Sequence, residues 1–445
     1  MRARQGERVQ NGRAISVFGL GYVGSVTAAC CASLGFRVTG VDVHPGKVAK
    51  LASGQAPIAE PGLDTLLKEQ HALGRVHASS DSAAAVQATE LSIVCVGTPS
   101  LPSGALDLSH VEAVTREIAA AIQAKSGNHV LVFRSTMLPG STRKLCQEFL
   151  GDLVNSGRLK VYFFPEFLRQ GSALADFLDP SLSALGAASA GEQPDSLLEG
   201  LIGPDTAIAA YEEAELLKYA CNAFHATKVA FANEIGRIGK SISIDSARVM
   251  DLLCSDTRLN VSPYYLRPGT PFGGSCLPKD VSALCVFART HDTSAPLLDS
   301  LMSTNERHLQ SLLELVERTG SRRILLLGLA FKAGTDDLRG SAMLELAAAL
   351  LLKNFQVLIF DPLVSSQQLI GANERFARLR LPNLASMLTQ DLVAAIADSE
   401  VIVASKKCVA PETLRPLLTN HHHVIDVNGW TELAALTPNY EGLCW

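Results

Sequence analysis

The run Gly19-Leu20-Gly21-Tyr22-Val23-Gly24 decides how the first part of the chain folds. An apolar stretch at residues 15–18 precedes it, and small residues that favour a helix follow it to about Leu34. A GxGxxG run between a predicted strand and a predicted helix is typical of a loop that lets the backbone approach a pyrophosphate, which the helix N-terminus then holds. A second predicted strand at 37–42 completes a βαβ unit. The sequence therefore predicts a dinucleotide-binding domain.

Asp42 indicates which dinucleotide binds. It ends the second predicted strand, at the distance from the glycine loop where a carboxylate meets the ribose hydroxyls of the cofactor. Val43 and His44 follow it, rather than an arginine that would accept a 2′-phosphate. We therefore expect NAD rather than NADP. The strand and helix around the loop disfavour the alternative, a glycine-rich turn without a ligand.

The rest of the chain repeats this organisation around a helical stretch. Further apolar strands are predicted at 91–96, 130–133 and 161–164, with a helix at 112–124. Residues 212–241 contain neither proline nor a turn cluster and predict one long helix, whose small and apolar residues suit packing against a second subunit. A second βαβ unit is predicted from strand 324–327, helix 341–352 and strand 356–361, followed by strands at 401–404 and 424–427.

The fold class is therefore predicted to be α/β, with two Rossmann-like, doubly wound domains joined by a long central helix. The expected boundaries are a disordered tail at 1–12, an NAD-binding domain at 13–208, a helical central domain at 209–315 and a second Rossmann-like domain at 316–445. A length of 445 residues is too great for a single core.

Composition excludes several classes of function. The chain is 47% hydrophobic and 19% charged, as in globular proteins, and its net charge of −5 provides no basic field for a nucleic acid or an anionic membrane. No apolar window of about 18 uncharged residues predicts a membrane span. The ten cysteines are scattered, without CxxC pairs or zinc-type histidine spacing, which predicts reduced thiols, a cytoplasmic location and no metal.

Cys276 is the candidate nucleophile. It stands in the run Phe272-Gly273-Gly274-Ser275-Cys276-Leu277-Pro278-Lys279-Asp280, where the glycine pair leaves the thiol open to a substrate. Pro278 suits the first position of a helix, so the helix dipole and Lys279 would favour a thiolate. A thiol attacks a carbonyl, so an alcohol must first be oxidised, and the predicted cofactor supplies the acceptor. The alternative, a small buried apolar residue, is disfavoured by the flanking glycines and charges.

Polar residues of the predicted long helix complete the candidate reacting centre. Lys218, Asn222 and His225 follow at i, i+4 and i+7, and Asn233 lies further along the helix. A cation and an amide donor beside a thiol are suited to stabilise an oxyanion. On the helix alone, Lys218 is better explained as a surface lysine than as a functional residue, and His225 is as well explained by packing between helices.

The second βαβ unit lacks the glycine fingerprint, because Gly328-Leu329-Ala330-Phe331-Lys332 stands at its turn. It is therefore expected to bind no second dinucleotide. Lys332 and Arg339 are candidates to meet the phosphates of a mononucleotide-type ligand, with solvated surface cations as the alternative.

Taken together, these motifs resemble the nucleotide-sugar dehydrogenases, which oxidise a hexose alcohol to a uronate. Besides the glycine loop and the Cys276 run, the resemblance rests on Glu60-Pro61-Gly62-Leu63, Val96-Gly97-Thr98-Pro99, Arg134-Ser135-Thr136, Pro165-Glu166-Phe167-Leu168-Arg169 and Phe331-Lys332-Ala333-Gly334-Thr335-Asp336-Asp337. It covers nearly the whole chain beyond the tail.

The resemblance implies a four-electron oxidation in which two NAD molecules are used in turn and Cys276 carries a thiohemiacetal and then a thioester. By similarity, Lys218 and Asn222 steady oxyanions, Asp280 and Thr136 hold the catalytic water, and Glu166 is the acid/base. The NAD site implied by the family comprises Gly19, Gly21, Tyr22, Val23, Gly24, Asp42, Lys47, Thr98, Thr136 and Lys279. The implied nucleotide-sugar site comprises Gln170, Lys218, Asn222, His225, Asn233, Tyr264, Tyr265, Arg267, Gly273, Lys332 and Arg339.

One predicted loop and the C-terminal residues indicate the branch of the family. Tyr264-Tyr265-Leu266-Arg267-Pro268-Gly269 and Glu441-Gly442-Leu443-Cys444-Trp445 resemble the branch that acts on GDP-mannose more than the branch that acts on UDP-glucose. We therefore expect GDP-mannose to be oxidised to GDP-mannuronate for an alginate-like polysaccharide, by a homodimer or higher homo-oligomer. UDP-glucose, a UDP-N-acetylhexosamine, and a nucleotide-sugar sensor without turnover are the alternatives.

Three residues depart from the family pattern. Gln170 replaces a second glutamate, Phe164 replaces an asparagine before Pro165, and Gly340 replaces a glutamate after Arg339. These changes leave the implied catalytic set intact. They bear on substrate affinity and sugar identity, because an amide keeps an acceptor but loses a charge.

Overall fold

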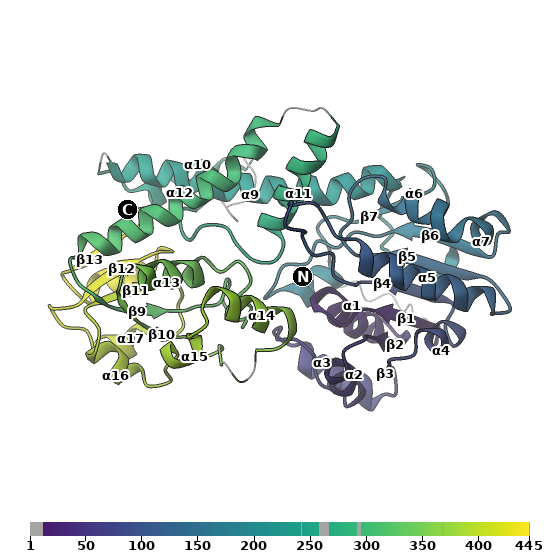
Figure 1. Cartoon of the computed structure of the whole chain (residues 1–445), viewed down its shortest axis with the longest axis horizontal. Coiled ribbons are helices and arrows are strands. Elements are labelled where there is room, and N and C mark those ends of the chain that lie inside the picture. Colours follow the sequence, from purple (N-terminus) through teal and green to yellow (C-terminus); the bar gives the residue numbers. More distant parts are fainter. Residues whose placement is uncertain are drawn as a thin grey trace. The chain divides into compact units, whose positions relative to one another are not determined.

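The computed structural model describes residues 12–241, 243–257, 267–291, 295–365, 367 and 369–444. The chain divides into two compact units, the first ending at Ala220 and the second beginning at Cys221. Figure 1 shows the first unit in purple to blue and the second in teal to yellow. Among the described helices, none combines the length and the apolarity needed to cross a membrane.

The first unit is built on an eight-stranded sheet with the order β3-β2-β1-β4-β5-β6-β7-β8. Its strands are β1 (Ala14–Phe18), β2 (Arg37–Val41), β3 (Val76–Ser79), β4 (Leu91–Val94), β5 (His129–Phe133), β6 (Leu159–Phe163), β7 (Ala184–Ala187) and β8 (Ala207–Ala210). All neighbouring pairs are parallel except β6 and β7. The strand order reverses beside β1, where Val17 pairs with Gly40 of β2 and Ile93 of β4. Ligands bind at such a reversal, beyond the carboxyl ends of the strands.

Both faces of this sheet are buried, because residues of one strand alternate between two cores. Ile15 and Val17 of β1 belong to the core that α1 and α3 cover, whereas Phe18 belongs to the core on the other face, with α5. The helices are α1 (Tyr22–Ser33), α2 (Pro45–Ala52), α3 (Leu63–Ala72), α4 (Ser82–Gln87), α5 (Ser109–Gln123), α6 (Ser141–Leu145), α7 (Gly151–Asn155) and α8 (Ala173–Leu178), with a π-helical turn at Cys146–Leu150 and a 3-10 turn at Ser196–Leu198.

The predicted long helix is confirmed as α9 (Tyr211–Ser241), a helix of 31 residues. It begins in the first unit and ends in the second. Glu215 fixes its first turns: the fully buried carboxylate accepts hydrogen bonds from the Gly140 and Thr142 N–H groups and from the Thr142 hydroxyl, each at 2.7 Å. Burial raises the pKa of Glu215 to about 7, although these donors oppose the shift. The segment after β5 is thereby tied to the helix that carries Lys218.

The second unit contains a five-stranded parallel sheet with the order β10-β9-β11-β12-β13. Its strands are β9 (Arg323–Leu327), β10 (Gln356–Phe360), β11 (Val401–Ala404), β12 (His423–Asp426) and β13 (Tyr440–Gly442). Its helices are α10 (Ser246–Ser255), α11 (Leu277–Thr290), α12 (Pro296–Arg318), α13 (Ala342–Leu352), α14 (Gly371–Arg380), α15 (Leu384–Met387), α16 (Leu392–Ala397) and α17 (Pro411–Leu414), with a 3-10 turn at Thr431–Ala435.

The β9 residues again alternate between two cores. Ile324 and Leu326 pack with α12 and α13, whereas Leu325 and Leu327 pack with α16 and α17 on the opposite face (Figure 1). The predicted fold class, two Rossmann-like α/β sheets and a long connecting helix, is confirmed.

Candidate active site

The glycine loop of the first unit has the geometry of a pyrophosphate cradle. Gly19 adopts φ +91°, and a Cβ there would lie 2.9 Å from the backbone of Val96. A Cβ on Gly24 would lie 1.7 Å from the Gly19 carbonyl oxygen, so this glycine lets α1 pack closely on the loop. A Cβ on Gly21, in contrast, would meet nothing within 4 Å, so the space beside this residue is open. The three glycines therefore fulfil the separate roles that a dinucleotide loop requires.

Asp42 follows β2 directly and faces the same loop. One carboxylate oxygen accepts the Leu20 N–H at 2.6 Å and contacts the Lys47 ammonium at 3.2 Å, and the other accepts the His44 N–H at 2.8 Å. The arrangement places the predicted ribose-binding carboxylate and Lys47 together at the carboxyl end of β2. The residues present thus fit NAD.

Further hydrogen bonds join segments around the cofactor loop. Thr98, after β4, donates its hydroxyl to the Thr136 carbonyl at 3.0 Å. Glu60, to which the sequence assigned no role, accepts the Tyr22 hydroxyl at 2.7 Å and the N–H groups of Gly171 and Ala173 at 2.8 and 2.9 Å. It therefore links the loop that begins α1 to the segment that follows Glu166. Its place in the Glu-Pro-Gly-Leu motif was the available signal.

Glu166 and Lys218 form a buried ion pair. The Lys218 ammonium lies 2.9 Å from Glu166, and the two side chains are 5% and 7% exposed. The other Glu166 oxygen accepts the Leu168 N–H at 2.8 Å. Burial by itself raises the pKa of Glu166, but Lys218, the Leu168 N–H and Arg134 outweigh it, and the pKa lies below its usual value. Glu166 is therefore a carboxylate at neutral pH, able to accept a proton.

The second unit brings Asn222, Lys279 and Asp280 together. The Asp280 carboxylate, which is buried, accepts a hydrogen bond from the Asn222 amide and lies 2.9 Å from the Lys279 ammonium. Asp280 lies in the first turn of α11, where a carboxylate interacts favourably with the helix dipole.

Cys276 caps this same helix. Its carbonyl accepts the Asp280 N–H at 2.8 Å, and its side chain is exposed, with the Ser275 hydroxyl 3.7 Å from the sulfur. All ten cysteines lie in the described part of the chain, none of them in a disulfide, and Cys276 alone among them is exposed. Pro278 occupies the second helical position rather than the predicted first, because Leu277 begins α11. The thiol nevertheless stands at the helix N-terminus, as the sequence predicted.

Three side chains from two helices hold the segment that leads to Cys276. Asn233 of α9 accepts the Gly269 N–H at 2.9 Å, and His308 of α12 contacts the Gly269 carbonyl at 2.6 Å. Asn305 of α12 accepts the Phe272 N–H and donates to the Phe272 carbonyl, both at 2.8 Å. Asn233, predicted as a substrate contact, orders the backbone before the thiol in the structure.

A cavity of about 470 Å³ opens at the carboxyl ends of β9, β11 and β12. Its lining includes Gly273 of the Cys276 run and Lys332, together with Lys406, Lys407 and Trp430. It lies beside the point where the strand order reverses and is bordered by the start of α13, features that favour a phosphate-bearing ligand. Arg339 makes a bidentate contact with Asp337 at 2.9 and 2.7 Å.

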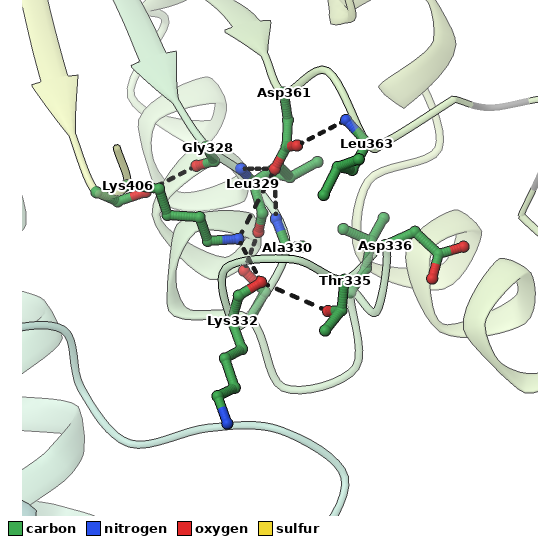
Figure 2. A network of polar contacts seen from close by, with 12 residues as sticks. Gly328, Leu329, Ala330, Lys332, Thr335, Asp336, Asp361, Leu363 and Lys406 are labelled. Carbon is green, nitrogen blue, oxygen red and sulfur yellow. Dashed lines mark hydrogen bonds and ion pairs between the residues drawn. The ribbon is translucent and has the colours of Figure 1, made fainter. Parts of the chain in front are cut away.

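Lys406, which the sequence analysis missed, lines this cavity. Figure 2 shows the polar contacts of Lys406. Its ammonium donates to the Lys332 carbonyl at 3.1 Å and lies 3.7 Å from Asp361. Asp361 also accepts the N–H groups of Leu329 and Ala330, at 2.7 and 3.1 Å. In Figure 2 the Lys332 side chain extends away from this network while its carbonyl takes part in it. The signal in the sequence was a lysine two residues after a predicted strand.

The charge of Lys406 is predicted to make ligand binding depend on pH. Burial lowers its pKa to about 8, although Asp361 partly offsets the shift. The ammonium is therefore present below about pH 8 and is lost above it. We expect GDP or UDP to bind about three- to tenfold more weakly at pH 9 than at pH 7, measured by calorimetry.

The Lys406→Met variant should bind GDP or UDP weakly at both pH values, and its affinity should lose most of its dependence on pH. Lys407→Met is the matched control, since Lys407 lines the same cavity but pairs with exposed Glu432 at 3.0 Å. It should keep the wild-type ratio between the two pH values. A pH ratio unchanged in Lys406→Met would contradict the assignment.

Of the remaining predicted substrate residues, those that the structure describes, Gln170, His225 and Arg267, do not line the cavity of the second unit. Tyr264 and Tyr265 lie outside the described residues. Arg267 lies 3.7 Å from Asp251 on the surface. His225 and Gln170 are half-buried. Val23, which was predicted for the NAD site, lies at the start of α1 among the residues packed on the core.

Comparison with known proteins identifies the family. The NAD binding, central and UDP binding domains of the UDP-glucose/GDP-mannose dehydrogenase family match residues 13–200, 212–307 and 325–432. The GDP-mannose 6-dehydrogenase of Pseudomonas syringae pv. tomato is 42% identical over 97% of this chain and 100% of its own. The UDP-glucose 6-dehydrogenase AglM of Haloferax volcanii is 35% identical over 81% of this chain and 85% of its own.

A solved structure agrees with this result. The UDP-glucose dehydrogenase of Pyrobaculum islandicum superimposes with a TM-score of 0.87, at 33% identity and 99% coverage of both chains. The predictions of NAD as cofactor and of a nucleotide-sugar dehydrogenase are confirmed. Since relatives more than 40% identical match it over nearly its whole length, the chain belongs to the UDP-glucose/GDP-mannose dehydrogenase family.

Proposed function

We propose that this chain is an NAD-dependent GDP-mannose 6-dehydrogenase that produces GDP-mannuronate through covalent intermediates on Cys276. The observation that carries the proposal is an exposed thiol at the N-terminus of α11, in a chain with a complete dinucleotide loop. The greater identity to the Pseudomonas GDP-mannose enzyme than to the Haloferax UDP-glucose enzyme supports the choice of sugar.

The reaction consumes one sugar, two NAD and one water. The C6 alcohol loses a hydride and its hydroxyl proton to become an aldehyde. The Cys276 sulfur then bonds to C6 as the aldehyde oxygen gains a proton, and loss of a second hydride and of the hydroxyl proton leaves a thioester. Water breaks the C–S bond and releases the acid and the thiol. Bound NAD supplies the hydride acceptor for both oxidations.

The residues of the chain supply the remaining chemistry. Glu166 accepts and returns protons as the buried carboxylate of this site, which its pairing with Lys218 keeps ionised between steps. Lys218 and the Asn222 amide stabilise negative charge on the C6 oxygen. Asp280, held by Asn222 and Lys279, orients the water with Thr136. Lys332 and Arg339 hold the nucleotide phosphates.

The test incubates the purified protein with NAD and, separately, GDP-mannose, UDP-glucose and UDP-N-acetylhexosamines. We expect two NADH per GDP-mannose. Turnover of a UDP-sugar without turnover of GDP-mannose would move the chain to the other branch. Tight binding of GDP-mannose in calorimetry without NADH from any sugar would favour the sensor.

We also propose a cytoplasmic homodimer that feeds an alginate-like polysaccharide, with an NAD-binding, a central and a nucleotide-sugar-binding domain at the boundaries given above. Leu216 and Phe231 of α9 are each nearly half exposed, which suits a helix that packs against a second copy. Light scattering coupled to gel filtration measures the assembly, and a monomer at micromolar concentration would contradict it.

A further inference from the structure

Gly340 lies where the Cys276 run meets the loop that carries Lys332 and Arg339. It adopts φ +63°, a conformation that L side chains rarely adopt. Its carbonyl oxygen accepts the Gly274 N–H at 3.3 Å. A Cβ on Gly340 would lie 2.7 Å from the Gly274 carbonyl oxygen and 3.0 Å from the Gly274 nitrogen, so a side chain there would displace the run.

The other partners in this contact are equally close. A Cβ on Gly273 would lie 2.0 Å from the Gly340 carbonyl oxygen. A Cβ on Gly274 would lie 2.7 Å from the ring of Phe331, the residue before Lys332. Three glycines thus let two backbone segments meet without side chains between them. One residue separates Gly274 from Cys276, so a shift at the contact is transmitted to the thiol.

We infer that Gly340 is a positioning residue, which seats Gly273-Gly274 on the 328–341 loop and so fixes the Cys276 sulfur relative to Lys332 and Arg339. The inference rests on the proposed function. It assigns a role to a residue at which this chain departs from the family pattern.

The surroundings of Gly340 leave this contact little freedom. Asn305 holds Phe272 on one side, and the Phe331 N–H donates to the Asp337 carbonyl at 2.8 Å on the other. Within the same loop, burial lowers the Arg339 pKa, but the hydrogen bonds to Asp337 and the charge of Asp337 outweigh burial and raise the pKa overall. Arg339 is therefore held by an ion pair inside the 328–341 loop.

The test compares Gly340→Ala with Gly371→Ala. Gly371 adopts φ +62°, but a Cβ there would meet nothing within 4 Å, so the control carries the same backbone strain without the contact. We expect Gly340→Ala to lower kcat about tenfold or more, with the KM for NAD within about twofold, because small misplacements of a reacting group are costly. The alkylation rate of Cys276 by iodoacetamide, followed on its peptide by mass spectrometry, should change about threefold or more. Gly371→Ala should match the wild type in both.

Equal kcat and equal alkylation in the two variants would overturn the inference. The alkylation comparison needs no substrate, so it still decides if the wild type oxidises no sugar, which would defeat the proposed function alone. Should the alanine variant fold poorly, Gly340→Asn and Gly371→Asn replace the pair, since asparagine tolerates positive φ while keeping the Cβ.

Discussion

The Cys276→Ser variant is expected to release the acid about a thousandfold more slowly than the wild type, or slower still, because serine is a far weaker nucleophile towards the aldehyde at neutral pH. The first oxidation does not need the sulfur, so the variant is expected to form one NADH and the aldehyde, either bound or released. NAD binding should stay within about twofold of the wild type, since the glycine loop and Asp42 are untouched. Stopped-flow NADH absorbance and mass detection of the uronate measure the two steps separately.

Two neighbouring variants control for effects on the loop. Ser275→Ala removes the hydroxyl that lies 3.7 Å from the sulfur and leaves the thiol in place. Cys285→Ser changes a buried cysteine of the same helix. Both should keep the thiol chemistry, and only Cys276 should yield a sugar adduct on its peptide. Full turnover to the acid by Cys276→Ser would refute covalent catalysis.

The fold was predictable where hydrophobic runs are continuous. Strands such as 130–133 and 401–404 are buried on both faces of a parallel sheet, and the structure places them at His129–Phe133 and Val401–Ala404. The missed strands carry weaker signals: β7 (Ala184–Ala187) is short and rich in small residues, and β8 is partly exposed at the sheet edge. Helix α12 was also missed, although it is long and amphipathic.

The candidate site was predictable where chemistry requires a motif. The glycine loop, Asp42 and the placement of Cys276 beside a helix N-terminus follow from local sequence. The contacts that orient these groups do not, because Glu60, Asn305 and Lys406 act on backbone atoms far away in the chain. The spacing of residues within a short stretch of sequence cannot identify such distant partners.

The structure explains two of the three departures from the family pattern, Phe164 and Gly340. The Arg134 guanidinium lies over the ring of Phe164, 4.8 Å from its centroid, so this phenylalanine provides an aromatic face for a buried cation. Gly340 provides the close approach to the Cys276 run. Nothing in the structure explains Gln170.

Lys218→Met is expected to reduce both activity and stability, because it leaves a buried carboxylate without its partner. The pair joins side chains that are 5% and 7% exposed, and removing one member of such a pair costs about 3 to 5 kcal/mol of unfolding free energy. A fall in kcat of about a hundredfold or more is expected from the lost cation at the C6 oxygen. Lys228→Met on the same helix is the control, since the Lys228 ammonium lies over the Phe224 ring at 5.0 Å.

The pH dependence of the lost stability shows whether the broken ion pair or a packing defect is its cause. In the wild type the Glu166 pKa lies below its unfolded value, so the pair contributes stability above the unfolded pKa, which is lost as the pH falls. Without Lys218, burial would instead raise the Glu166 pKa, and the variant would lose stability as the pH rises. Its deficit in denaturant unfolding should therefore be larger at pH 8 than at pH 5.

Adding Glu166→Gln to Lys218→Met should recover most of the stability at pH 8 but none of the activity, because the amide removes the unpaired charge without restoring a proton acceptor. Two results would contradict this account: a loss of unfolding free energy in Lys218→Met that is the same at both pH values, or one that persists in the double variant. Either result would show that Lys218 does not stabilise the fold through the ion pair. The activity of the double variant tests the second role, since turnover near the wild-type level would remove both residues from the mechanism.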